Sequence, residues 1–260
     1  MATHLARMFQ QNSYAIECIW SRTLDHARQL ADEVDAYAYT DDLLSIPLYA
    51  DYYIIATSDS AIPSVVRSIP ALNEDAILIH TSGSTDISVL SKAGRYGVLY
   101  PCQSFSKNIS FDYSNIEWLV EGNDDESLLS VRQLAETIPH KTVTEADSNQ
   151  RRTLHMAAVW ASNFTNRMLV EAYDIMSGAN LDPHLLDSLV RQTVDKALST
   201  NPRDAQTGPA RRRDENIINM HLSLLSDNPE LENLYRLISK RIMLHRHPFR
   251  KRQHSFRHPY

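Results

Sequence analysis

The chain has 260 residues, of which 43% are hydrophobic and 22% charged, and its formal net charge is −6. These values are typical of a globular protein with one or two domains and a sizeable core. No apolar run is long enough for a membrane helix, the first residues lack the apolar segment of a signal peptide, and two cysteines exclude a disulfide scaffold or a multi-cysteine metal site. We therefore expect a cytoplasmic protein with no membrane partner and no metal.

The first 143 residues alternate short apolar runs with amphipathic stretches. The apolar runs predict strands at 14–20, 52–57, 76–80, 96–101 and 116–121, and the stretches between them predict helices at 2–9, 24–34, 62–69 and 124–138. Strands that are apolar throughout and alternate with helices indicate a mostly parallel sheet covered on both faces. Such sheets bind ligands beyond the carboxyl ends of their strands.

Residues 148–244 contain no strand-like run. We predict a long helix over 148–178 with Ser148 as its N-cap, a helix that starts at Pro183, a polar loop over 201–213, and helices over 214–225 and 229–244. The predicted fold class is therefore α/β plus all-α. We expect an α/β domain over 1–145, an all-helical domain over 146–244 and a disordered basic tail over 245–260.

Charge is distributed unevenly between the body and the tail. The tail contains five Lys or Arg residues and no acid, so removing these five from the net charge of −6 leaves −11 for residues 1–244. A body this acidic is a poor match for phosphate backbones, and we expect no nucleic-acid partner.

Polar residues follow three of the predicted strands. At Ser21-Arg22-Thr23 no acid is present to bind a ribose 2′-hydroxyl, whereas a guanidinium suits a 2′-phosphate. The alternative for Arg22 is a solvated surface arginine. Thr57-Ser58 and His80-Thr81-Ser82 end the most apolar runs, where their side chains can bind a ribose or nicotinamide. Ordinary turn chemistry is the alternative for both.

The long predicted helix has a row of polar residues. At 100° per residue, His155, Ser162 and Asn166 lie within about 40° of one another, with Asn163 further round. A histidine in such a row can serve as general acid or base, and amides can orient a substrate. Solvent-facing polar residues are the alternative. Likewise the 201–214 loop, with Arg211, Arg212 and Arg213, either binds an anion or is simply solvated.

Glycine is scarce, with six in the whole chain and none before Gly83. No glycine-rich phosphate loop is therefore present.

Eight segments together resemble the DUF2520 family, a group with a Rossmann-like NADP-binding domain joined to a helical domain: residues 1–6, 21–23, 50–59, 80–84, 100–106, 147–159, 163–166 and 205–214. The family is similar to pyrroline-5-carboxylate reductase, ketopantoate reductase and F420-dependent NADP reductase. The resemblance implies a Rossmann-like, mostly parallel sheet followed by a helical domain like that of 6-phosphogluconate dehydrogenase. It also implies a bacterial protein.

The resemblance further implies NADP as cofactor, a small-molecule substrate and a homodimer. Cofactor contacts would come from Ser21, Arg22, Thr23, Thr57, Ser58, His80, Thr81 and Ser82. The catalytic side would include His155, Asn163 and Asn166, with Gln206, Thr207 and Arg212 binding substrate. The implied activity is hydride transfer between NADP(H) and a carbonyl, imine or hydroxy compound. The alternative is a non-catalytic NADP-binding sensor or assembly module.

One departure from the family concerns the N-terminus. The family usually begins with a strand and a glycine-rich loop, whereas Met1-Ala2-Thr3-His4 stands where the first helix begins. We expect the missing central strand to leave the backbone groups of its neighbours unpaired. Two interpretations stay open, an internal methionine taken as the start or a defective cofactor binder, and the intact remaining motifs favour the first.

Overall fold

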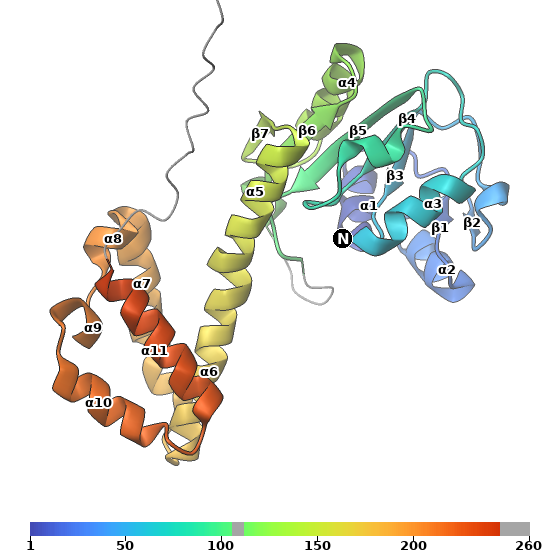
Figure 1. Cartoon of the computed structure of the whole chain (residues 1–260). Helices are drawn as coiled ribbons and strands as arrows, with labels where there is room; N and C mark the ends of the chain where they lie inside the picture. Colours follow the sequence, from blue (N-terminus) through green and yellow to red (C-terminus); the bar gives the residue numbers. More distant parts are fainter. Residues whose placement is uncertain (106–111, 245–260) are drawn as a thin grey trace, which may run out of the picture. The chain divides into compact units, whose positions relative to one another are not determined.

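The computed structural model describes residues 1–105 and 112–244, and the expected tail over 245–260 lies outside this range. The chain divides into two compact units, with the division after Glu171 (Figure 1). Within the described residues, no helix is both long and apolar enough to cross a membrane.

The first unit is built on a five-stranded sheet. In spatial order its strands are β3 (Tyr52–Ile55), β4 (Ile77–His80), β5 (Arg95–Pro101), β6 (Glu117–Gly122) and β7 (Thr142–Glu145). Neighbouring strands are parallel except β5 and β6. The expected mostly parallel sheet is therefore confirmed, although β6 runs against it. The sequence reading missed β7 because its residues are polar and form no apolar run.

A second, two-stranded parallel sheet consists of β1 (Ile19–Trp20) and β2 (Tyr39–Thr40). The strand expected over 14–20 is thus much shorter, and β2 was not predicted. In the described chain β1 pairs only with β2, and β3, at one end of the larger sheet, pairs only with β4. The apolar run at 52–57 predicts a strand covered on both faces, and this prediction was wrong for β3. Tyr53 and Ile55 are buried, whereas Tyr52 and Ile54 on the other face are only half-buried.

Helices cover both faces of the larger sheet. On one face α1 (Ala2–Gln11) and α4 (Asp125–Glu136) pack with Leu99, Trp118 and neighbouring side chains. Side chains alternate along a strand, so Val98, Tyr100 and Leu119 point to the other face. There they meet Leu154 of α5 (Ser148–Ala158). The same face packs against α3 (Ile62–Ser68), while α2 (Leu24–Glu33) contacts β1 and β2.

Short 3₁₀ turns complete the first unit at η1 (Leu43–Ser45), η2 (Asp59–Ala61), η3 (Ile87–Leu90) and η4 (Tyr113–Asn115).

The long helix predicted over 148–178 consists of three parts: α5, a π-helical segment η5 (Val159–Phe164) and α6 (Thr165–Gly178). Its N-cap is Asp147 rather than Ser148, because Asp147 and Gln150 form a capping box. A π turn adds about one residue to the helix, which rotates every later position by roughly 100°. The row predicted from His155 to Asn166 assumed unbroken α geometry and is therefore not continuous.

The second unit consists only of helices in its described part: the end of α6 from Ala172, η6 (Pro183–Leu186), α7 (Asp187–Ser199), α8 (Pro202–Ala205), α9 (Pro209–Arg212), α10 (Glu215–Leu224) and α11 (Pro229–Met243). The prediction of a loop over 201–213 was wrong, because Pro202 and Pro209 each start a single helical turn. From residue 172 onward, the buried apolar side chains in the described chain are Ala210, Ile218 and Leu222.

Candidate functional site

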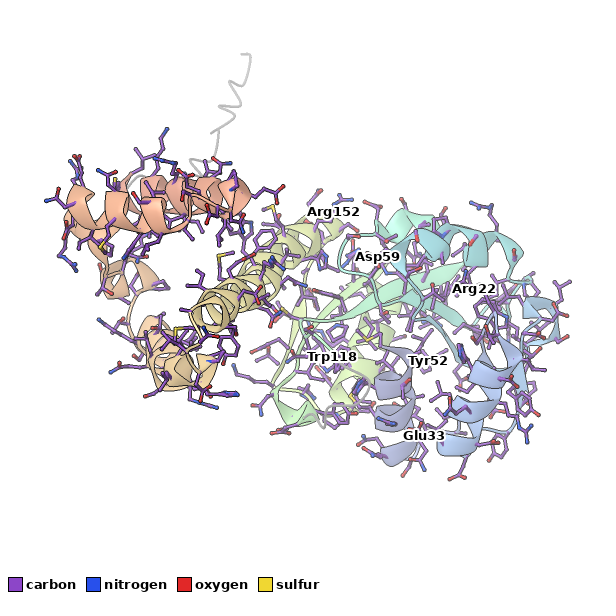
Figure 2. The ribbon with its side chains drawn as sticks, turned by 90° about the horizontal axis from the view of Figure 1, so that it is seen from below. Arg22, Glu33, Tyr52, Asp59, Trp118 and Arg152 are labelled. Atoms are coloured by element: carbon purple, nitrogen blue, oxygen red, sulfur yellow. The ribbon has the colours of Figure 1, made fainter. Side chains whose placement is uncertain are left out.

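The candidate site lies where β3, β4 and β5 end. The loops after β3 and β4 are joined by a hydrogen bond from Ser84 Oγ to Asp59 Oδ2, at 2.5 Å. Thr57 is half-buried and Ser58 is exposed, so both hydroxyls remain accessible at this edge. Figure 2 shows Asp59 among the side chains of the first unit. The arrangement places hydroxyl and carboxylate groups at the edge where parallel sheets bind ligands.

His80, Thr81 and Ser82 are all buried at the end of β4. The Ser82 N–H donates to Nδ1 of His80 at 3.1 Å, so the ring carries its proton on Nε2. Nε2 has no hydrogen-bond partner in the described chain. Burial, together with the nearby charge of Arg151, lowers the pKa of His80 to about 4. The histidine is therefore neutral at physiological pH.

The Ser82 hydroxyl folds the loop back on itself. Its Oγ accepts the Ser84 and Thr85 N–H groups, at 3.1 and 2.9 Å. Together with the burial of all three side chains, this indicates that His80, Thr81 and Ser82 shape the loop. Within this loop Ser84 is exposed and so remains accessible to a ligand.

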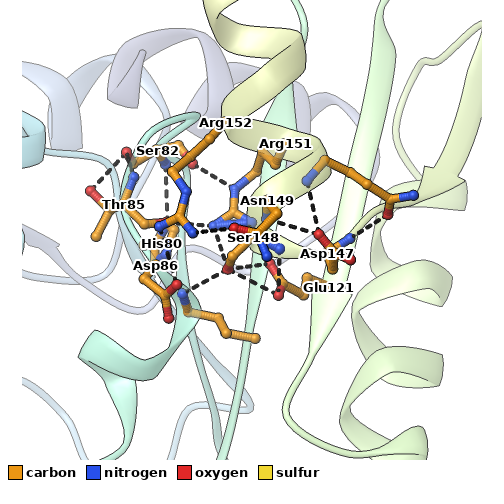
Figure 3. Close-up of polar contacts among 12 residues, drawn as sticks. His80, Ser82, Thr85, Asp86, Glu121, Asp147, Ser148, Asn149, Arg151 and Arg152 are labelled. Atoms are coloured by element: carbon orange, nitrogen blue, oxygen red, sulfur yellow. Dashed lines mark hydrogen bonds and ion pairs between the residues drawn. The ribbon is translucent and has the colours of Figure 1, made fainter. Parts of the chain in front are cut away.

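Arg151 fixes this loop from α5. Its side chain is completely buried, and it donates to the carbonyl oxygens of Ser82 and Thr85. It also forms an ion pair with Glu121 of β6. Figure 3 shows the guanidinium between the loop and Glu121. The loop, the sheet and the helix are thus joined by one charged group.

Ser148 completes the same network. Its N–H and hydroxyl donate to Glu121 at 2.9 and 3.0 Å, and its Oγ accepts the Ile87 N–H at 3.1 Å. Burial raises the pKa of Glu121, against the opposing effect of Arg151.

The sequence analysis did not predict this cluster of Arg151, Glu121 and Ser148. One sequence signal pointed to a buried charge. Arg151 lies three residues before Leu154 and seven before Ala158, which places it on the apolar stripe of the helix.

His155 lies one helical turn after Arg151 and meets the same loop. Its Nδ1 is 3.3 Å from the hydroxyl of Tyr100, which is 7% exposed at the end of β5. Burial raises the pKa of Tyr100 to about 12. A Cβ at Gly83 would lie 2.8 Å from Nδ1 of His155 and 2.9 Å from the Tyr100 ring. Gly83 is therefore required for the close approach of loop and helix.

The predicted residues Asn163 and Asn166 are exposed. Asn163 lies in η5 and Asn166 in α6, and neither side chain has a hydrogen bond or ion pair in the described structure. The structure brings neither of them into contact with His155. π-helical segments occur frequently at functional sites, so the helix around η5 stays a candidate part of the site.

Ser21, Arg22 and Thr23 form the turn from β1 into α2. Arg22 is exposed and has no ion-pair partner among the described residues (Figure 2). Thr23 is the N-cap of α2, but its side chain caps no N–H group. A free cation beside an uncapped helix N-terminus suits an anion.

In the second unit, Gln206, Thr207 and Arg212 are exposed around Gly208. The side-chain amide of Gln206 donates to the carbonyl of Thr207 at 3.0 Å. Gly208 has a φ of +101°, a conformation that residues with a side chain rarely adopt.

No group of three or more His, Cys, Asp or Glu residues in the described parts of the chain could hold a metal ion.

Comparison with known proteins then connects both units to a family. A crystal structure of a "putative NADP oxidoreductase" from Bacteroides fragilis is 38% identical, with 93% of each chain covered and a TM-score of 0.86. A family model described as "Domain of unknown function (DUF2520)" matches residues 116–242. The chain belongs to the DUF2520 family. The DUF2520 match starts just before β6, so it includes the last two strands of the sheet.

Two further structures are similar to this DUF2520 protein. Protein TM1727 from Thermotoga maritima is 26% identical, with 92% of this chain and 93% of that chain covered and a TM-score of 0.70. An imine reductase from Myxococcus stipitatus in complex with NADP+ is 13% identical, with 94% and 88% covered and a TM-score of 0.63, which supports the fold alone. No curated protein matches the chain. The expected Rossmann-like fold with a helical C-terminal part is confirmed.

Proposed function

We propose that this DUF2520 protein is an NADP-dependent oxidoreductase. It transfers a hydride between the nicotinamide and a small carbonyl, imine or hydroxy compound. The observation that carries the proposal is the pairing of Tyr100 and His155 beside Gly83, at the ligand-binding edge of the sheet. The name of the Bacteroides fragilis relative supports it. Bound cofactor would supply the hydride, and the chain would bind, orient and exclude water.

The residues present fit the adenosine end of NADP. The guanidinium of Arg22 is exposed and has no ion-pair partner among the described residues, and it lies at the N-terminus of α2, which the Thr23 side chain does not cap. This combination suits a 2′-phosphate. Ser21 and Thr23 supply further hydroxyls, and Thr57 and Ser58 would bind the rest of the dinucleotide. The chain has no glycine-rich loop for the pyrophosphate. A test on the adenosine end alone therefore separates the role of Arg22 from that of the missing loop.

Replacing Arg22 with alanine is expected to weaken binding of 2′,5′-ADP by about 10- to 100-fold, because a charge-assisted hydrogen bond contributes about 1.5–3 kcal/mol. Binding of 5′-AMP, which has no 2′-phosphate, should not change. Isothermal titration calorimetry measures both ligands. Arg28→Ala is the matched control, since Arg28 is also exposed on α2 but is paired with Asp32. Equal losses for the two ligands would contradict the assignment.

Catalysis is tested by incubating the protein with NADPH and a panel of aldehydes, ketones, imines and hydroxy acids. We expect oxidation of NADPH by at least one carbonyl or imine compound. The competing proposal is a non-catalytic NADP sensor or assembly module on the same fold. Binding of NADPH without oxidation by any member of the panel would favour that alternative.

In the first unit, the exposed amides of Asn163 and Asn166 are proposed to orient a small polar substrate. In the second unit taken by itself, the exposed residues Gln206, Thr207 and Arg212 are proposed to form a substrate-binding surface. Both cysteines are free thiols, which fits the reducing cytoplasm that we propose as its location.

We propose that the protein is a homodimer joined through its helical unit. Along η6 and α7, Leu185, Leu189 and Leu198 are 68%, 59% and 80% exposed. Only three apolar side chains are buried in the described part of this unit. Helices with so small a core need a permanent partner. A second copy is always available to cover the same faces in a two-fold arrangement.

The dimer is tested with the double variant Leu185→Asp/Leu189→Asp. Light scattering should give twice the chain mass of 29.7 kDa for the wild type and a single chain mass for the variant. Far-UV circular dichroism should show a loss of helix in the variant. Gln133→Asp, an added charge at an exposed position of α4 in the first unit, is the control and should stay dimeric. A monomeric wild type would overturn the proposal.

A further inference from the structure

The hydrogen bond between Tyr100 and His155 has a direction that the surroundings decide. The Tyr100 hydroxyl and Nδ1 of His155 are 3.3 Å apart, and the two rings meet edge to face at 78°. Either atom could in principle donate. The tyrosine is buried among Val98, Leu119 and Ala146, whereas His155 is half-buried on α5.

The tyrosine must be the donor. Burial raises the pKa of Tyr100 to about 12, so the hydroxyl keeps its proton at physiological pH. Nδ1 of His155 is the one hydrogen-bond partner of this hydroxyl in the described structure. A buried hydroxyl needs an acceptor for its proton, and Nδ1 is the acceptor at hand. Donation to Nδ1 leaves the imidazole proton on Nε2.

The loop after β4 packs against this imidazole. Gly83 is buried, and its missing side chain lets the loop approach both rings, since a Cβ would lie 2.8 Å from Nδ1. Nε2 of His155 has no hydrogen-bond partner in the described chain, whereas Nδ1 is occupied by Tyr100. Nε2–H is therefore the group that remains for a ligand.

We propose that Tyr100 is a positioning residue that fixes His155 as a neutral hydrogen-bond donor, with Nε2–H directed at an acceptor atom of the substrate. The inference rests on the proposed hydride transfer and narrows its substrate class. A carbonyl oxygen or a neutral imine nitrogen has a lone pair that can accept from Nε2–H and become polarised. A protonated iminium has none. Ketones, aldehydes and neutral imines are therefore the preferred substrates.

The tautomer is tested by long-range ¹H–¹⁵N NMR of the full chain, a measurement that needs no substrate. The wild type should show His155 with its proton on Nε2 and with Nδ1 shifted upfield by the accepted hydrogen bond. In Tyr100→Phe the Nδ1 resonance should move downfield, towards that of a free acceptor nitrogen. The variant His155→Gln assigns the signals.

Two controls separate this effect from general disturbance. The His221–Tyr235 pair in the second unit has the same kind of contact, at 2.8 Å, and its signals should not move in Tyr100→Phe. Gly83→Ala should also shift Nδ1 of His155, because the new Cβ displaces the ring. Gly94→Ala, with nothing within 4 Å of its Cβ, should not. A proton on Nδ1 in the wild type, or an unchanged Nδ1 in Tyr100→Phe, overturns the proposal.

Kinetics with the compounds that oxidise NADPH complete the test. Tyr100→Phe should lower kcat about tenfold for carbonyl compounds and leave the KM for NADPH unchanged, because only the tautomer and orientation of His155 are affected. Unchanged kcat overturns the catalytic part of the inference. If no compound reacts while the NMR result holds, hydride transfer fails and the fixed tautomer stands.

Discussion

Replacing Arg151 with methionine is expected to lower the free energy of unfolding by about 3–5 kcal/mol. The substitution keeps an unbranched side chain but removes the charge that faces Glu121 inside the protein. Glu121 would then be a half-buried carboxylate without its ion-pair partner, and the carbonyl groups of Ser82 and Thr85 would lose their donor. Urea denaturation at pH 7, followed by tryptophan fluorescence and circular dichroism, measures the change.

Arg152→Met is the matched control for this prediction. Arg152 is the next residue and also forms an ion pair, with Asp86 at 3.2 Å, but both of these side chains are exposed. Exposed pairs contribute about 0–1 kcal/mol, so this variant should be almost as stable as the wild type. Adding Glu121→Gln to Arg151→Met should restore part of the loss, because the unpaired charge is then removed. Equal costs for the two arginine variants would refute the role assigned to Arg151.

Acidification from pH 7 to pH 5 is expected to remove about 2 kcal/mol of stability through His80 alone. The folded protein holds His80 with a pKa of about 4, whereas the ordinary value is 6.5. Between these two values the unfolded chain binds a proton that the folded chain does not. The free energy of unfolding therefore falls as pH decreases from 6.5 towards 4, and the contribution is constant above and below this window.

His80→Asn tests this dependence. The amide oxygen of asparagine can accept the Ser82 N–H in place of Nδ1, and it does not titrate. Urea denaturation at several pH values should give a flatter stability profile for the variant than for the wild type. His26→Asn, at an exposed position of α2, should give a profile parallel to that of the wild type. Parallel profiles for His80→Asn and the wild type would show that another group is responsible.

Much of the fold could be predicted from hydrophobic periodicity, because four of the five strands in the larger sheet are apolar runs. The strands β2 and β7 could not be predicted, since their short polar sequences are stabilised by neighbouring strands rather than by their own composition. The π-helical segment at Val159–Phe164 was also invisible, because its residues fit an ordinary helix. Its extra residue breaks the expected row of polar side chains.

The candidate site was predicted only in part. The sequence names Arg22 and His155 as candidates because strand ends and a helix face point to them, and their roles stay predictions. Tyr100 and Glu121 were missed, because their roles depend on contacts with residues 30 or more positions away. Arg151 was missed because a single sequence does not show that an arginine on an apolar stripe has a carboxylate partner in the sheet.

The buried guanidinium of Arg151 also determines how the binding edge behaves when a ligand arrives. Any rearrangement of residues 82–86 would separate the guanidinium from the Ser82 and Thr85 carbonyl groups. Its positive charge would then be exposed to solvent or left buried without these hydrogen-bond partners. Such local opening therefore breaks charge-assisted hydrogen bonds to a buried group, which is costly. This wall of the site is therefore preorganised, and little of the binding energy is spent on ordering it.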